Sequence, residues 1–254
     1  MMPNRGVVFG FAVCMFILFG TAGVSAAESG GIDAVVKVIQ GTARVYADGA
    51  TLGTPLKKGS HVAKDHEIAV AAKSRLEVQF PDGTVIRLAE NSRLKMKGLE
   101  FNKQNGKKNF YVGLLAGRLW AKVKKLTTPD SSVEVATVNA VAGVRGTVFR
   151  VNVDEDKSAL VKVYDGSVYV ANPPRDAAHP NDSITAPREV AGPHAVPPPV
   201  HEVSMEEWTF IVKAMQQVSI SPQGFASKPQ DFDSRADADE WVVWNQELDK
   251  KVSF

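Results

Sequence analysis

Short runs of alternating apolar and polar residues, joined by Asp-Gly pairs, most constrain how this chain can fold. Residues 75–80 read Arg-Leu-Glu-Val-Gln-Phe, and a second alternating run follows the pair Asp82-Gly83. The pair Asp165-Gly166 joins two further runs of the same kind. Alternation with a period of two places every second side chain on one face of a strand, and Asp-Gly favours the tight turn of a β-hairpin. The sequence therefore predicts antiparallel hairpins.

Strand-like runs of this kind recur at short spacing from residue 32 to residue 170. This spacing predicts an all-β domain, either a multi-stranded sandwich or roll or a short β-solenoid. Residues 111–123 fit a strand, a turn at Gly117 and a second strand, with Leu119 and Trp120 as core candidates. A chain of 254 residues is long enough for one sizeable core and an appendage.

The N-terminus has the pattern of a secretory signal peptide over residues 1–27. Arg5 precedes an apolar run over residues 7–19, and the small residues after it fit cleavage behind Ala26 or Ala27. The run is short for a membrane span, which needs roughly 20 apolar residues. We therefore expect a periplasmic or secreted protein without a stable membrane span. A retained apolar run acting as an anchor is the alternative.

The remaining chain divides by composition into three parts. Eight of the fourteen prolines lie between residues 172 and 200, which is typical of an extended linker because proline cannot donate a ladder hydrogen bond. We expect a β domain over residues 28–172, a Pro-rich linker over residues 173–202 and a helical segment over residues 203–254.

Two helices are predicted in the C-terminal segment. Ser204 and Glu207 fit a capping box. Apolar residues then follow at helical spacing: Trp208, Ile211, Val212, Met215 and Val218. A second helix is expected over residues 236–252, with Trp241, Trp244 and Leu248 on one stripe. We predict that Trp208, Trp241 and Trp244 dock these helices on the β domain.

The formal net charge of +2 conceals an uneven distribution. Residues 87–125 hold eleven Lys and Arg against two acids, whereas residues 202–249 hold ten acids against three bases. Either the acidic tail covers the basic face, or the basic face meets an anionic envelope polymer or a membrane surface. Solvated lysines without a partner are a third interpretation. Nucleic acid is not expected as a partner because the signal peptide directs export.

The stretch Gly143-Val144-Arg145-Gly146-Thr147 raises the question of a functional loop. Upstream the small apolar residues have even numbers, whereas downstream, from Phe149, they have odd numbers. A slip of one residue turns every later side chain to the other face, and a β-bulge at glycine absorbs such a slip.

We therefore expect a corner with a bulge at Gly146. Arg145 would leave the core face and reach a carboxylate or free carbonyl groups. A phosphate-binding loop is disfavoured because strand follows strand here, whereas that loop runs from a strand into a helix. The functional alternative is that Arg145 is an exposed contact to an anionic ligand.

The sequence gives little support to an enzyme. The single cysteine, Cys14, lies in the predicted signal peptide, and the five histidines do not follow a metal-ligand spacing. The nucleophile pattern Gly-x-Ser-x-Gly does not occur either. We expect no catalytic residue, no metal site and no cofactor.

These residues also carry a family resemblance. The residues from Gly143 to Thr147 with Phe149, followed by Asp165-Gly166, resemble the FecR domain. Residues 115–120, Leu-Ala-Gly-Arg-Leu-Trp, and the turn at Asp82-Gly83 are similar to the same family, so the resemblance covers roughly residues 35–172. Val138 differs from the family pattern, which usually has proline after the threonine.

The resemblance implies a β-rich module that binds other components of the cell envelope. The best-known family members are inner-membrane regulators with a cytoplasmic anti-sigma segment before their span. Only about five residues precede the apolar run here, so we expect an exported form without that segment. An envelope protein or an anionic glycan is the expected partner, with a role in signal sensing. A membrane-anchored signalling regulator is the alternative.

Overall fold

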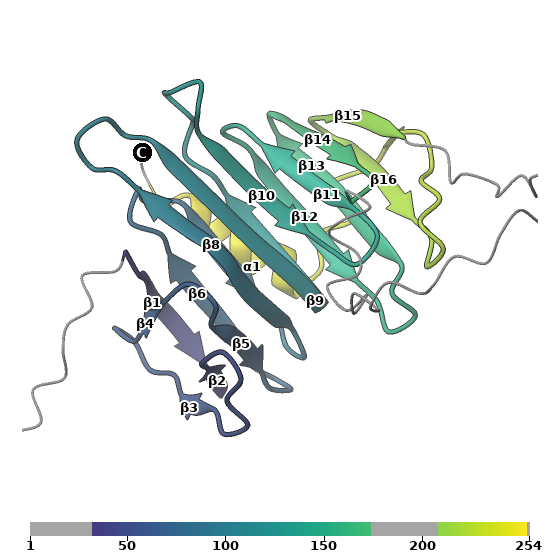
Figure 1. Cartoon of the computed structure of the whole chain (residues 1–254). Helices are drawn as coiled ribbons and strands as arrows, with labels where there is room; N and C mark the ends of the chain where they lie inside the picture. The colour runs from purple at the N-terminus through teal and green to yellow at the C-terminus, as the bar shows by residue number, and fades with distance from the viewer. Residues whose placement is uncertain (1–31, 174–207, 253–254) are drawn as a thin grey trace, which may run out of the picture. The chain divides into compact units, whose positions relative to one another are not determined.

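The computed structural model describes residues 32–173 and 208–252, and their strands form one hydrogen-bonded network (Figure 1). The predicted all-β class is confirmed, since these residues hold seventeen strands and one α-helix. The predicted signal peptide over residues 1–27 lies outside the described residues, as does the linker over residues 173–202 apart from Pro173.

The network folds into two layers because one long strand belongs to both. The first part of β9 (Lys108–Lys122) pairs with β8 (Arg93–Phe101) and β10 (Ser132–Ala136). Its last part pairs with β7 (Val85–Leu88) and β12 (Val148–Val153). Gly117, where the change occurs, has φ +85°, and a Cβ there would lie 2.6 Å from the Cα of Ser92. The turn predicted at Gly117 is therefore a bend within a continuous strand.

We call the two layers A and B. Across layer A the strands are β4 (His61–Val62), β1 (Ala34–Gln40), β6 (Arg75–Gln79), β7, the end of β9, β12, β13 (Ala159–Asp165), β16 (Gln216–Ile220) and β17 (Gln230–Asp231). Across layer B they are β3 (Thr54–Pro55), β2 (Ala43–Tyr46), β5 (Glu67–Val70), β8, the start of β9, β10, β11 (Val141–Val144), β14 (Ser167–Ala171) and β15 (Thr209–Lys213). Of the described pairings, β9 with β10 is parallel and the others are antiparallel.

The core lies between the two layers. Leu76, Val78 and Phe80, predicted to share a face, are all buried in it, as is Leu119. Burial of one such side chain contributes about 1.5–3 kcal/mol, so a core of this size holds the layers together without a disulfide. Trp120 is buried as well, but it packs in a second cluster on the outer face of layer A.

The first predicted C-terminal helix is wrong. Its residues form β15 and β16, which pair with β14 and β13 and so extend both layers. Val212 of β15 and Val218 and Ile220 of β16 alternate into the core, and Met215 takes φ +64° in the turn between the strands. Pairing with β13 and β14 and burial of these side chains in the core favour strands, and this tertiary effect outweighs the helical spacing. Ser204 and Glu207 lie outside the described residues.

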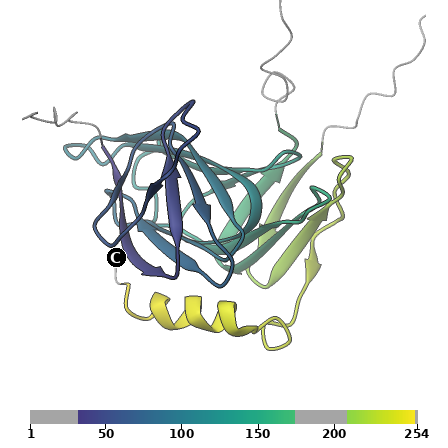
Figure 2. The same ribbon diagram turned by 90° about the horizontal axis from the view of Figure 1, so that it is seen from below.

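The second predicted helix is present as α1 (Glu240–Asp249), so the described part of residues 203–254 holds one helix rather than two. Asp239 caps its N-terminus, because its carboxylate accepts a hydrogen bond of 2.7 Å from the backbone N–H of Val242. Figure 2 shows α1 lying along the outer side of one layer. Its contacts with Arg87 and Trp120 identify this side as the outer face of layer A.

Candidate functional site

A row of large polar and aromatic side chains crosses the outer face of layer A beneath α1. Strand pairing places six residues side by side in the order Glu77, Arg87, Trp120, Arg150, Lys162 and Gln217. We call this set the covered row. The side chain of Arg87 is fully buried, and Arg150 is 5% exposed. Buried charges require partners, and the C-terminal residues supply most of them.

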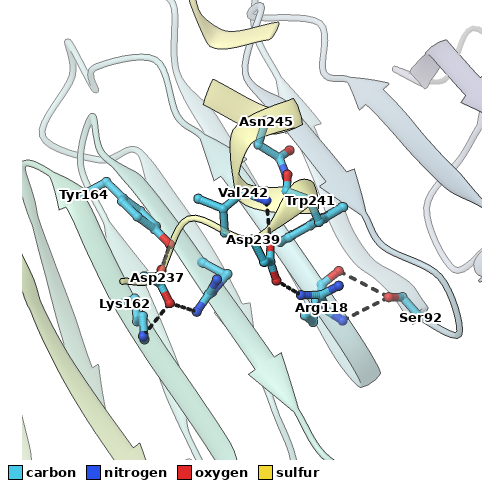
Figure 3. Close-up of polar contacts among 10 residues, drawn as sticks. Ser92, Arg118, Lys162, Tyr164, Asp237, Asp239, Trp241, Val242 and Asn245 are labelled. Atoms are coloured by element: carbon cyan, nitrogen blue, oxygen red, sulfur yellow. Dashed lines mark hydrogen bonds and ion pairs between the residues drawn. The ribbon is translucent and has the colours of Figure 1, made fainter. Parts of the chain in front are cut away.

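Asp237, just before α1, meets the covered row at β12 and β13 (Figure 3). Its carboxylate accepts hydrogen bonds from Arg150 (2.8 Å), Lys162 (2.7 Å) and the hydroxyl of Tyr164. Burial acts to raise the pKa of Asp237, but the hydrogen bonds from Lys162 and Tyr164 and the charge of Arg150 lower it below its ordinary value. Burial, together with the hydrogen bond to Asp237, raises the pKa of the Tyr164 phenol. The carboxylate is therefore held in its charged form.

Asp239 makes a second contact one strand further along. Its carboxylate accepts a hydrogen bond of 2.6 Å from Arg118, whose guanidinium lies 4.9 Å from the centre of the Trp241 ring (Figure 3). Burial acts to raise the pKa of Asp239, but the N–H of Val242 and the Arg118 guanidinium lower it. The Trp241 ring packs edge-on against Trp120 at 6.3 Å between centroids. The start of α1 is thus held by charge and by aromatic packing.

Asp249, at the end of α1, binds the other end of the covered row. Its carboxylate accepts hydrogen bonds from Arg87 (2.5 Å) and from the indole of Trp120 (3.0 Å). Arg87 also donates to Glu77 at 2.6 Å. The ammonium of Lys122 donates to the backbone carbonyls of Asp249 and Val252, each at 2.7 Å. The C-terminal segment therefore covers part of the basic stretch 87–125, since it contacts three of its eleven bases, Arg87, Arg118 and Lys122.

The covered face is not fully hydrogen-bonded. Seven buried side-chain polar atoms of the described residues have no partner, and six belong to this face or to α1. The six are Arg87 Nη2, Arg150 Nε, Asn152 Oδ1, Gln217 Oε1, Trp241 Nε1 and Asn245 Oδ1. An unpaired buried group opposes burial by about 1–3 kcal/mol. The attachment of α1 therefore depends on its ion pairs and apolar contacts.

The glycine-flanked arginine occupies a crossing between the two layers. β11 ends at Val144 in layer B and β12 begins at Val148 in layer A. This change of layer explains the phase slip in the sequence, so the predicted bulge at Gly146 is wrong. The register irregularity lies between Val148 and Phe149, opposite β13. Gly146 does take positive φ, +76°, and a Cβ there would lie 2.9 Å from the Cα of Lys125.

The other residues of the motif are structural. Val144 and Phe149 are buried in the core, and the carbonyl of Thr147 accepts a hydrogen bond of 2.9 Å from Val123. The hairpin predicted at Asp165-Gly166 is wrong: this pair carries the chain from β13 in layer A to β14 in layer B, and these two strands do not pair. Gly166 packs against the crossing at Gly146, because a Cβ on it would lie 2.8 Å from Thr147 Cγ2. Two segments of the sequence motif thus meet in space.

Arg145 does not make the predicted contact. Its side chain is exposed, and it forms no hydrogen bond or ion pair with another described residue. It borders a shallow depression of about 280 Å³ on the outer face of layer B, lined also by Gly143, Ser167, Tyr169 and Ile211. A Cβ at Gly143 would meet no atom nearer than 3.9 Å, so the missing side chain leaves this space open. The arrangement suits an anionic group beside an apolar one.

The first Asp-Gly turn has a structural role. Gly83 has φ +95°, and the carboxylate of Asp82 accepts hydrogen bonds from the backbone N–H (2.9 Å) and the hydroxyl (2.8 Å) of Thr84. Asp82 also forms a buried ion pair with Lys108. This pair removes one base of the stretch 87–125 from the surface.

The three tryptophans occupy different places. Trp208 precedes β15, stacks on Phe210 at 5.8 Å and donates to the carbonyl of Gly224 at 2.8 Å, at the edge of the main core. Trp241 is buried under α1. Trp244 is partly buried, with the Arg75 guanidinium 5.3 Å from its ring centre. Two of the three thus attach α1, whereas Trp208 belongs to the strands.

Residues 66–169 match the family model described as FecR protein. These residues are thus similar to the FecR domain, and they make up less than half of the chain. The match runs from the start of β5 into β14 and includes the crossing at Arg145. It ends before β15, so the acidic partners of the covered row in the C-terminal segment lie outside the matched residues.

Two crystal structures are similar to the chain, both described as "a putative anti-sigma factor" from Parabacteroides distasonis ATCC 8503, at 19% identity. One alignment covers 71% of this chain and 64% of the solved chain with a TM-score of 0.47. The other covers 66% and 61% with a TM-score of 0.45. The chain thus spans less than two thirds of either solved chain. A search of curated proteins finds no match.

Residues 32–173 and 208–252 bring together no group of three or more His, Cys, Asp or Glu side chains suited to a metal ion. In the same ranges, the one helix is too short to cross a membrane. The described residues offer two surfaces for comparison, the covered row of layer A and the open depression of layer B.

The covered row was not predicted from the sequence as a set of contacts. Two features of the sequence indicate a polar face of this kind. They are the contrast between the basic stretch 87–125 and the acidic stretch 202–249, and the alternation of Arg118, Trp120 and Lys122 along one strand. Which acid meets which base depends on strand order and register, which a single sequence does not give. The FecR match itself does not reach Asp237 or Asp249.

Proposed function

We propose that the chain is exported to the cell envelope, where its FecR domain is a non-enzymatic module that binds a partner protein in a signalling process. The FecR match supports a regulatory domain, and the N-terminal sequence pattern supports export. The partner surface that we propose is the outer face of layer B around Arg145. Tyr169 and Ile211 are 52% and 62% exposed there.

The observation that carries this proposal is the state of Arg145. The buried cations of the described residues, Arg87, Lys108 and Arg150, are all paired with carboxylates. Arg145 lies at the centre of the family motif, yet it has no partner among the described residues. An exposed guanidinium beside an aromatic ring and an aliphatic side chain is typical of a protein-binding hot spot, in which arginine and tyrosine are enriched.

The test is photo-crosslinking in the native envelope from an unnatural residue placed at position 169, comparing Arg145→Ala with unsubstituted Arg145. We expect Arg145→Ala to lose the crosslinked species and keep its melting temperature. Lys58→Ala is the matched control, because Lys58 is an exposed cation near β3 and β4, at the far edge of both layers. An Arg145→Ala protein that crosslinks like the control would contradict the proposal.

An anionic envelope polymer is the second candidate partner. Five bases of the stretch 87–125 form no ion pair with a described residue: Lys97, Lys103, Lys107, Lys124 and Lys125. Retention on an immobilised polyuronic acid separates the two candidates. Strong, salt-sensitive retention that falls with each lysine removed would favour the polymer. The protein partner predicts weak retention that Arg145→Ala hardly changes.

Export and membrane tethering are separated by the mass of the mature protein. We expect a species that begins at Ala27 or Glu28. A species that retains residues 1–26 in a membrane fraction would favour the anchored regulator instead. The binding surface on layer B is the same in both cases.

A further inference from the structure

The four edges of the two layers differ in how they end. Three end in strands of two residues, β3, β4 and β17, and β3 contains Pro55. Short edge strands and proline are devices that prevent further strand pairing. The fourth edge is β15, with five residues, and among the described residues it pairs only with β14. Among the described residues, this edge of layer B is therefore the longest of the four, and it contains no proline.

The unused hydrogen-bonding groups of β15 can be assigned from its register. The N–H of Asn172 donates to the carbonyl of Trp208 at 3.4 Å, which fixes this pair as hydrogen-bonded. Hydrogen-bonded and non-hydrogen-bonded pairs alternate along antiparallel strands. Ile211, three residues on, therefore directs its N–H and carbonyl away from β14. Lys213 follows the same rule, because its N–H donates to Gln216 Oε1 at 3.2 Å.

Exposed apolar side chains gather along this edge. Four of the seven exposed large apolar residues of the described chain lie here: Tyr169, Ile211, Met215 and Phe225. Met215 lies in the turn after β15. Phe225 follows Gly224, whose carbonyl accepts the indole N–H of Trp208 just before β15. The edge thus offers backbone groups flanked by apolar surface, which is the requirement for strand addition.

We propose that β15 accepts an extended segment of a partner protein, in which apolar and polar residues alternate, as an additional strand of layer B, with an acidic residue of that segment beside Lys213. The inference rests on the proposed binding function and names the kind of segment bound. The edge and the open depression are continuous, because Tyr169 and Ile211 are paired neighbours that line both. One partner can therefore cover Arg145 and extend β15.

Two other occupants fit less well. Seven of the residues from 174 to 207 are prolines, and proline cannot donate to a ladder. A second copy of the chain would bring like charges together, since β15 carries one charge, that of Lys213, and Arg145 borders the adjoining depression. Two five-residue strands would also fall short of the roughly 1,200–2,000 Å² that a stable interface buries.

The experiment measures amide hydrogen exchange of the full mature chain with and without the peptide Asp-Thr-Val-Thr-Val-Thr-Asp. We expect fast exchange at Ile211 in the free protein and exchange slowed about tenfold by the bound peptide. Ile211→Thr keeps the N–H and should bind the peptide about as well. Ile211→Pro lacks the N–H and should bind it about tenfold more weakly, the loss of roughly one hydrogen bond.

Folding of the variants is checked by thermal melts, and Thr209→Pro, which also removes an outward N–H, serves as the second variant. Three results would overturn the inference. They are a slow Ile211 amide in the free protein, no slowing at millimolar peptide, and equal binding by a folded Ile211→Pro protein. If the Ile211 amide of the free protein exchanges faster when the protein is diluted, a second copy of the chain is the occupant. The two experiments can fail separately. If Arg145→Ala loses the crosslink but Ile211→Pro binds the peptide as well as the unsubstituted protein, strand addition is refuted and the proposed function still stands.

Discussion

The two layers share one hydrophobic core, but their outer faces differ in whether their charged residues have partners within the chain. On layer A the covered row meets acids from the C-terminal segment, so its charges are paired within the chain. On layer B, Arg145, Tyr169 and Ile211 stay exposed and the edge strand β15 is unpaired on one side in the described residues. A charged sheet face is therefore not in itself a binding site. What distinguishes the two faces is whether the chain supplies its own partner.

The largest expected difference between the faces comes from matched aromatic truncations. Trp120→Ala should destabilise the protein by about 3–5 kcal/mol, because it opens a cavity beneath α1 and leaves Asp249 with one donor fewer. Tyr169→Ala on layer B should change stability by about 0.5 kcal/mol or less. Urea unfolding of both variants tests this contrast. Equal losses would mean that the outer face of layer B is covered as well.

Removal of a single acid should have the next largest effect. Asp237→Ala leaves Arg150 and Lys162 without their shared carboxylate in a largely buried place, and we expect a loss of about 1.5–3 kcal/mol. Glu247→Ala is the control, since Glu247 pairs with Lys250 on an exposed surface of the same segment. A similar melting temperature for both variants would show that the covered row does not hold α1.

Acid should release α1 before it disturbs layer B. The pKa of Asp237 and that of Asp239 lie below the ordinary value of 3.8. A carboxylate with a lowered pKa adds stability at pH values above its unfolded pKa, and this stability is lost as pH falls through the folded value. The protection factors of the α1 amides, which are corrected for the intrinsic pH dependence of exchange, should therefore be the same at pH 7 and pH 5 and fall below about pH 4. Asp237→Asn should flatten this dependence.

The smallest effect on stability is expected for Arg145→Ala, within about 0.5 kcal/mol of the unsubstituted protein, because the side chain has no described partner to lose. Differential scanning calorimetry measures it. Gly146→Val provides the contrast within the same crossing: positive φ and the backbone of Lys125 leave no room for a branched side chain, so several kcal/mol should be lost. A large loss in Arg145→Ala would restore a structural role for the arginine.

Local patterns predicted much of the fold. Alternation gave the strand faces of residues 75–80 correctly, Asp82-Gly83 marked the hairpin turn between β6 and β7, and Gly146 does take positive φ. The hairpin predicted at Asp165-Gly166 is wrong, because the two strands that this pair joins lie in different layers. Residues 208–218 were predicted as a helix because Trp208, Val212 and Met215 also satisfy helical spacing. Their strand structure depends on the free edges of β13 and β14, a tertiary effect that propensity does not contain.

The candidate site was less predictable. The phase slip at the motif was visible in the sequence, but a bulge and a crossing between layers produce the same slip. The exposure of Arg145 could not be deduced either, since it depends on where the neighbouring acids lie. The family resemblance, in turn, gave the motif and not the surface, because the edge at β15 lies outside the matched residues.

The contacts of α1 have a consequence for the order of events during biosynthesis. Arg87 and Asp249 are separated by 162 positions, and Trp120 and Asp249 by 129. Because a chain is synthesised from its N-terminus, the basic strands emerge long before their acidic partners. Contacts so distant in sequence slow folding. Until the last residues are released, Arg87, Arg150 and Lys162 lack their C-terminal carboxylates and can bind other anions.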